Sequence, residues 1–127
     1  DFTFCHEDAD YAHNQAEQYL ATYLQSLLEH YELMGDHLGK TKGYTGYGKQ
    51  AEVLRHIGFE RYVEGFLASN AYGTPQQMLD KFKARYDIIG SFELATCFRF
   101  GGIPYEEAES SMRLFARQVL PEFKSWA

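Results

Sequence analysis

Residues 97–123 have the sequence CFRFGGIPYEEAESSMRLFARQVLPEF, and this stretch decides the fold class. Residues 91–98 are mostly apolar and predict a strand, which a glycine pair then ends. Residues 104–120 have the apolar spacing of an amphipathic helix, and Pro121 predicts its end. A strand that feeds a helix through a glycine turn is half of a parallel α/β repeat.

The same alternation extends back through the chain. Residues 1–5 predict a short strand, and the apolar residues that follow Asp8 and Asp10 recur at steps of three and four to about Met34. This spacing predicts one long helix, which either aspartate could cap. Residues 49–58 and 60–68 predict two shorter helices that are split at Gly58.

A second start signal lies in the middle of the chain. Thr74, Pro75 and Gln77 form the pattern of a capping box, and the helix that they begin should run to about Ile89. The preceding residues 66–73 predict either a short buried strand or the end of the previous helix, and the periodicity does not choose between them.

One segment has neither helical nor strand period. Residues 35–50, GDHLGKTKGYTGYGKQ, include five glycines, so we expect residues 36–48 to form a mobile surface loop. Tyr44 and Tyr47 could line a ligand entrance there, or they could belong to an ordinary loop that happens to have aromatic residues.

Composition bounds the class of protein. The chain has 127 residues, 45% of them hydrophobic, which suffices for one domain with a core. A net charge of -6 argues against nucleic acid as a partner. No run is long and apolar enough to suggest a membrane span, and we expect a cytoplasmic protein. Cys5 and Cys97 have no metal-binding spacing, so we expect reduced, buried thiols and no metal site.

The order of predicted elements implies parallel strands, and in folds of this kind the ligand chemistry lies at the C-terminal ends of the strands. In this chain these ends are residues 5–7, 72–74 and 98–102. The sequence starts at Asp1 inside a predicted strand, and we expect it to be a piece of a longer protein.

Two stretches resemble a known family. The segments YGTPQQMLDKF and FELATCFRFGGIPYEEAESSMRLFARQVLPEF are similar to the C-terminal end of the bacterial luciferase-like flavin-dependent monooxygenases. The resemblance covers residues 71–125 and extends more loosely to FTFCHEDADYAHNQAEQY. It implies an α/β fold, the C-terminal part of a TIM (β/α)8 barrel, with two to three parallel strands and long helices in a single segment, residues 1–127.

The resemblance also implies reduced flavin, with FMN expected, as the cosubstrate and insertion of oxygen from O₂ into an organic substrate. Much of the flavin phosphate site would come from earlier units of the barrel, and the segment by itself need not bind flavin or be active. The implied partners are a small-molecule substrate and either further copies of this chain or the remainder of the barrel. The rival interpretation is a non-catalytic α/β interaction or assembly module.

His6 and Arg99 are the candidate catalytic residues. The resemblance places His6 where related enzymes have a basic side chain after the sixth strand, which could pair with an anionic substrate or a flavin peroxide. A surface histidine that caps the next helix is the alternative. Arg99 could bind a ligand anion or form a salt bridge with Glu7 or another carboxylate.

The candidate cofactor-binding residues lie in the two turns that precede helices. Thr74 could hold a phosphate at its helix start or only cap the helix, and the glycines could serve backbone geometry alone. The set comprises Gly73, Thr74, Phe100, Gly101 and Gly102.

Overall fold

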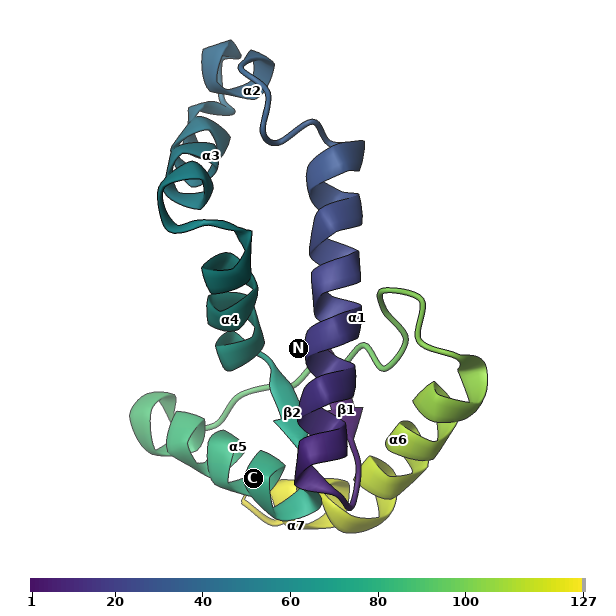
Figure 1. The fold of residues 1–127 in the computed structure, drawn as a ribbon. Helices are drawn as coiled ribbons and strands as arrows, with labels where there is room; N and C mark the ends of the chain where they lie inside the picture. The colour runs from purple at the N-terminus through teal and green to yellow at the C-terminus, as the bar shows by residue number, and fades with distance from the viewer. Residues whose placement is uncertain (127) are drawn as a thin grey trace.

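A computed structural model describes residues 1–126. The strands are β1 (Thr3–Cys5) and β2 (Ala71–Gly73). The helices are α1 (Ala9–His30), α2 (His37–Lys40), α3 (Thr45–Ile57), α4 (Phe59–Ser69), α5 (Pro75–Ile89), α6 (Tyr105–Gln118) and α7 (Leu120–Ser125). The short strands, α5, α6 and α7 form a base, from which α1, α3 and α4 extend toward α2 at the opposite end (Figure 1).

The strands β1 and β2 pair in parallel, with Thr3 opposite Ala71 and Cys5 opposite Gly73. The other edge of β1 is paired once, through an isolated parallel bridge between Phe2 and Cys97. The parallel α/β class predicted from the sequence is therefore confirmed.

Alternate strand residues face different helices. Phe4 packs with α1 residues such as Ala16 and Leu20 in one core cluster. Cys5 and Ala71 point the other way and belong to a second cluster, with residues of α5, α6 and α7. Because helices cover both faces, the sheet is the middle of three layers.

The strand order and the position of the helices can be compared with the predicted TIM barrel. The described residues form no closed barrel, and β1 lies between β2 and the Cys97 bridge. Successive strands of a TIM barrel are neighbours and have their helices on the outer face only. Residue 97 would then pair beside β2 rather than β1.

Several helices agree with the sequence signals. Ala12, Ala16, Leu20 and Leu24 recur every four residues and form the buried face of α1, which ends at His30, slightly before the predicted end. The predicted split at Gly58 separates α3 from α4. Residues 66–73 combine both alternatives, because they include the end of α4 and the strand β2.

Two local predictions were wrong. Residues 36–48 are not free of regular structure, because α2 lies within them and α3 begins at Thr45; their mobility remains a prediction. Residues 91–98 form no strand beyond the Cys97 bridge, because Phe92 and Phe98 pack on Phe123 and Phe115 instead of extending a ladder. The helix predicted before Pro121 is confirmed as α6, which ends at Gln118. Pro121 itself lies in the first turn of the short helix α7, where a proline is tolerated and which the sequence did not predict.

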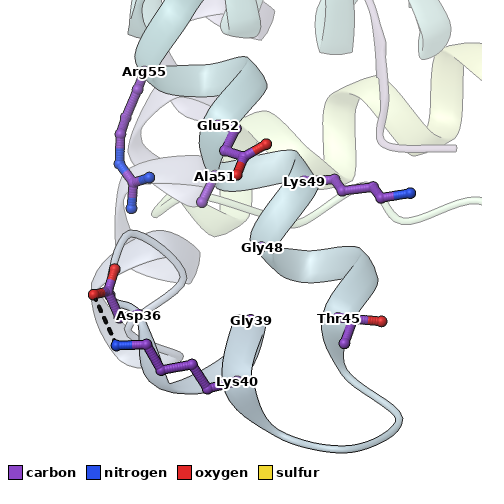
Figure 2. Close-up of a pocket in the computed structure, with 10 residues that line it drawn as sticks. Asp36, Gly39, Lys40, Thr45, Gly48, Lys49, Ala51, Glu52 and Arg55 are labelled. Carbon is purple, nitrogen blue, oxygen red and sulfur yellow. Dashed lines mark hydrogen bonds and ion pairs between the residues drawn. The ribbon is translucent and has the colours of Figure 1, made fainter.

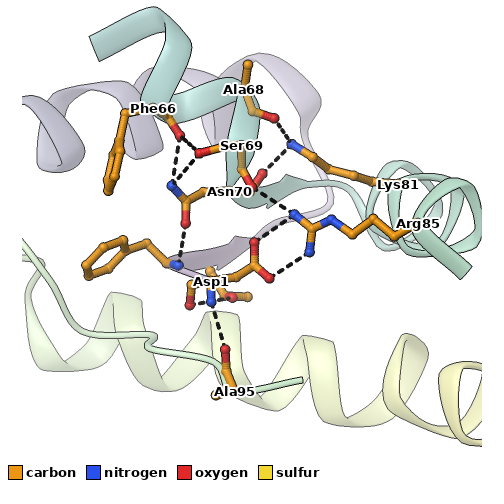
Figure 3. A network of polar contacts seen from close by, with 10 residues as sticks. Asp1, Phe66, Ala68, Ser69, Asn70, Lys81, Arg85 and Ala95 are labelled. Carbon is orange, nitrogen blue, oxygen red and sulfur yellow. Dashed lines mark hydrogen bonds and ion pairs between the residues drawn. The ribbon is translucent and has the colours of Figure 1, made fainter. Parts of the chain in front are cut away.

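A polar cluster fastens the start of β1 to the junction of α4 and β2 (Figure 3). The buried Asn70 side chain accepts a hydrogen bond from Phe2 N at 2.8 Å and donates one to Phe66 O at 2.8 Å. Arg85 of α5 donates to both carboxylate oxygens of Asp1, at 2.7 and 2.8 Å. These contacts hold the sheet, α4 and α5 together.

Lys81, also on α5, belongs to the same cluster. Its ammonium group donates to Ala68 O and Asn70 O at the end of α4. Burial, with a smaller contribution from Arg85, lowers the pKa of Lys81. The ammonium nevertheless suits this position, because carbonyl groups at a helix C-terminus attract cations.

We expect Asn70→Ala to lower the free energy of unfolding by about 1–3 kcal/mol, because it leaves the Phe2 N–H without its partner, whereas the Phe66 carbonyl keeps the Ser69 hydroxyl as a donor. Chemical denaturation measures this change. Asn14→Ala, at an exposed position of α1, is the matched control. Equal stability of the two variants would show that the Asn70 contacts do not hold the strands.

Candidate functional site

The C-terminal ends of the two strands bring three of the predicted site residues together. His6 N donates to Gly73 O at 3.1 Å, and Thr74 follows Gly73. The His6 ring lies 4.4 Å from the Tyr11 ring, and its Nδ1 accepts a hydrogen bond from Asp8 N at 3.0 Å. This last contact agrees with the capping alternative for His6, and its catalytic role stays a prediction.

A hollow of about 180 Å³ opens beside His6, between the end of β1 and α6. Glu7 lines it on the strand side, and Glu107 and Arg117 line it on the helix side. It therefore combines an imidazole, two carboxylates and a guanidinium, which could bind a small polar molecule and exchange a proton with it.

Two contacts fix α6 against this end of the sheet. Ser111, which is buried, accepts a hydrogen bond from Cys5 N at 2.8 Å and so completes the edge of β1 beyond the Cys97 bridge. Tyr11 OH donates to Glu107 at 2.9 Å, and this hydrogen bond is the main cause that raises the pKa of Tyr11. The sequence did not single out Ser111 or Glu107 as neighbours of His6.

The turn between β2 and α5 is filled by its own capping contacts. Thr74 Oγ1 accepts from Gln77 N at 3.3 Å, and Gln77 Oε1 accepts from Thr74 N at 2.9 Å. Gly73 has a φ of +128°, and a Cβ there would lie 2.6 Å from Gln77 Oε1. The predicted capping box is confirmed, and it uses the donors that a phosphate would need.

The start of α6 is no better suited to a phosphate. Its first turn includes Glu106 and Glu107, whose carboxylates would repel an anion. With the donors at α5 occupied, neither of these two helix starts fits the phosphate of FMN. The geometry of these two turns therefore gives no support to a phosphate contact there, and flavin binding stays a prediction.

The remaining predicted site residues contact other parts of the structure than His6. Arg99 stacks on the Tyr105 ring at 4.0 Å, and within residues 1–126 it forms no ion pair, so the expected salt bridge with Glu7 is absent. Phe100 is buried and packs on Phe2 with ring centroids 5.1 Å apart. Phe100 therefore serves the core in this structure.

Gly101 is required by a close approach to α1. Its φ is +56°, and a Cβ there would lie 1.8 Å from the carbonyl oxygen of Tyr19. The neighbouring Gly102 has a φ of +89° and open space around it. The glycine pair thus lets the chain turn against α1 before α6 begins.

A polar hollow of about 280 Å³ lies at the opposite end of the molecule, between α2 and α3 (Figure 2). Residues 35–41, GDHLGKT, approach a phosphate-binding loop but have three residues between the glycines where that motif has four. Lys40 binds Asp36 at 3.1 Å, and Thr41 Oγ1 donates to His37 O at 2.7 Å. The flanking strand and long helix that such a loop needs are absent from residues 30–45.

The two cysteines differ from each other. Cys5 is buried, as expected, and burial raises the pKa of its thiol to about 12, which makes it unreactive. Cys97 is exposed, so the prediction of two buried thiols was wrong for this residue, which lies at the edge of the narrow sheet. Among residues 1–126, no group of three His, Cys, Asp or Glu side chains is placed to hold a metal ion.

Comparison of the chain with protein-family models, with curated proteins and with solved structures finds no match. The resemblance to flavin-dependent monooxygenases therefore remains an expectation from the sequence. Within residues 1–126, no helix combines the length and the apolar character needed to cross a membrane.

We expect Gly101→Ala to lower the free energy of unfolding by more than about 3 kcal/mol, because its methyl group would collide with the α1 backbone. Gly102→Ala is the matched control, since it has backbone strain of about 1–3 kcal/mol but no collision. Thermal or chemical denaturation compares the two variants. If both lost the same stability, the glycine pair would have no special contact with α1, and a role in binding would gain weight.

Proposed function

We propose that this chain is the C-terminal portion of a flavin-dependent monooxygenase of the luciferase-like family, which oxidises an organic substrate with reduced flavin and O₂. The similarity of residues 71–125 to the end of that family is the first support. The observation that carries the proposal is the parallel pairing of β1 with β2, which puts His6 beside Gly73 at the C-terminal edge of the sheet. Active sites of TIM barrels lie at this edge.

Under this proposal the chain supplies part of a substrate pocket, and residues outside 1–126 hold the flavin phosphate. Arg99 would provide positive charge toward an anionic substrate group, and His6 would donate a hydrogen bond to it from Nε2. Assembly of a complete barrel would require residues 91–98 to pair beside β2, because consecutive barrel strands are neighbours. The two backbone hydrogen bonds of Cys97 with residues 1–3 and the contact of Asp1 N with Ala95 O would then have to break. The helices α1 and α5, which cover opposite faces here, would have to lie on the same face.

The test uses the natural protein that contains this chain. We expect it to bind FMN, and to consume O₂ when reduced flavin and substrate are supplied. His6→Ala and Arg99→Ala should each lower kcat/KM by roughly tenfold or more through lost electrostatic stabilisation. Both side chains are outside the core, so urea midpoints should change little.

Absence of flavin binding in the natural protein would overturn the proposal. Unchanged kcat/KM in both variants would instead remove these two residues from the site. His13→Ala is a matched control for His6→Ala, since His13 lies on the exposed side of α1 and pairs only with Glu17 and Tyr72.

A second function is favoured by a different observation. Helices cover both faces of the sheet within this chain, as expected for a self-contained domain rather than for a barrel segment. A non-catalytic α/β module that assembles with itself or with a partner would have this form. Exposed apolar residues such as Ile88 and Ile89, which are 83% and 65% accessible at the end of α5, are candidates for such contacts.

The state of association tests whether the chain is a portion of a barrel. A portion of a barrel has an open strand edge at β2, and open edges promote pairing with other chains. We therefore expect the 127-residue chain to form dimers or larger species at micromolar concentration, measured by sedimentation or light scattering. A monomer that unfolds cooperatively would contradict the barrel-portion proposal and support a self-contained domain.

A further inference from the structure

A cleft of about 660 Å³ lies at the end of α1 that is remote from the sheet. It is bounded by the end of α1, the turn that follows, α2, and residues of α3 and α4. In Figure 1 this region is at the top of the molecule, where α1 leads into α2. Its volume falls within the range of roughly 300–1,000 Å³ that is typical of small-molecule sites.

Tyrosines dominate the lining of this cleft. Tyr31 caps α1, Tyr44 and Tyr47 lie at the start of α3, and Tyr62 comes from α4. Tyr31, Tyr44 and Tyr47 are 57%, 50% and 43% accessible, so much of their ring surface is in water. The rings of Tyr44 and Tyr47 have centroids 6.0 Å apart. These tyrosine rings thus line a cleft and are not part of the hydrophobic core.

The charge of the lining has one sign. Of the described residues that line the cleft, Glu32 is the only carboxylate, and none is a lysine or an arginine. His30 and His37 complete the ionisable groups besides the tyrosines, and His37 Nδ1 lies 3.6 Å from the Glu32 carboxylate. With neutral histidines, the cleft has one negative charge, on a chain whose net charge is -6.

Glu32 also has an unusual backbone. Its φ of +48° makes it the only non-glycine residue with a positive φ among residues 1–126. It follows the C-cap of α1 in a tight turn, in which Leu33 N donates to Leu28 O at 3.0 Å, and glycine is the usual residue at such a position. Strained residues of this kind concentrate at ligand sites, and here the strain holds a carboxylate at the wall of an aromatic cleft.

The walls of the cleft are braced from outside. Arg55 of α3 donates to Met34 O at 2.8 Å, which ties α3 to the turn after α1. Gly39 and Gly48 let α2 approach α3 closely, because a Cβ on Gly48 would lie 3.0 Å from the Cα of Gly39. These contacts connect α2 and α3 to the turn after α1 and so support the walls of the cleft.

We propose that this cleft binds an organic cation, a substituted ammonium group attached to an apolar body. The faces of Tyr31, Tyr44 and Tyr47 would attract the cation through their ring electrons, as aromatic residues do for quaternary ammonium groups. Glu32 supplies the countercharge, and the half-buried Leu27 and Leu38 contact the apolar part. This site is separate from the edge of the sheet and does not depend on the flavin proposal.

The experiment compares choline with 3,3-dimethylbutan-1-ol, its uncharged isostere of nearly the same shape. Each is titrated into the 127-residue chain, and amide resonances of residues 27–62 are followed by NMR. We expect choline to shift these resonances with a dissociation constant in the millimolar range or below, and the uncharged alcohol to bind at least about tenfold more weakly. Equal binding of the two, or no binding of choline, would overturn the proposal.

Variants locate the site. Tyr44→Leu and Tyr47→Leu should each weaken choline binding by roughly threefold to tenfold, in keeping with cation–aromatic contacts at partly exposed sites. Tyr105→Leu on α6, which removes a tyrosine that is 69% accessible, is the control and should leave choline binding unchanged. The assignment would be contradicted if the control variant lost choline binding, or if Tyr44→Leu and Tyr47→Leu both bound choline as tightly as the unchanged chain.

Glu32 provides the most specific test. Glu32→Gln keeps the side-chain size and removes the charge, and it should weaken choline binding but leave binding of the alcohol unchanged. Glu32→Gly should weaken choline binding while it raises thermal stability, because glycine relieves the left-handed backbone. Unchanged choline affinity in both variants would show that the carboxylate has no part in recognition.

Discussion

The parallel pairing of β1 with β2 is the constraint on which the rest of the structure depends. Each strand has only three residues, so the ladder provides few hydrogen bonds, each contributing about 0.5–1.5 kcal/mol. Side chains therefore support β1 on both edges: Asn70 accepts from Phe2 N beside β2, and Ser111 accepts from Cys5 N on the opposite edge. Once this register is fixed, Phe4 must face α1 and Cys5 must face α6, which places both core clusters.

The helices could be predicted from the sequence because their signals are local. The Thr74 capping box and the stops at Gly58 and Gly90 depend on nearby residues, and the structure has helix ends at all three. Residues 91–98 could not be predicted correctly from their own sequence. A strand also needs a neighbouring strand whose backbone N–H and C=O groups are unpaired. Ser111 takes the position on β1 that a longer third strand would occupy, and Phe98 packs on Phe115.

The same distinction applies to the candidate site, where the contacts set by strand pairing could be predicted and those set by helix packing could not. His6 and Gly73 follow paired strands, so their proximity was predictable from parallel pairing alone. Arg99 and Gly101 come after the chain has left the sheet, and their neighbours Tyr105 and Tyr19 depend on how α6 and α1 pack. The tyrosine cleft combines four separate segments, and the sequence indicated only the part of it in the glycine-rich loop.

The position of residues 91–98 decides how the fold relates to a barrel. Two backbone hydrogen bonds join Cys97 to residues 1–3, whereas Phe92 and Phe98 pack in the aromatic cluster under α5, α6 and α7. Full burial of a large side chain stabilises by about 1.5–3 kcal/mol and a hydrogen bond by about 0.5–1.5 kcal/mol, so the partial burial of Phe92 and Phe98 and the two hydrogen bonds contribute on the same scale. A rearrangement that put residue 97 beside β2 would have to keep these aromatic contacts. A barrel arrangement would also require α1 and α5 to lie on the same face of the sheet, whereas here they cover opposite faces.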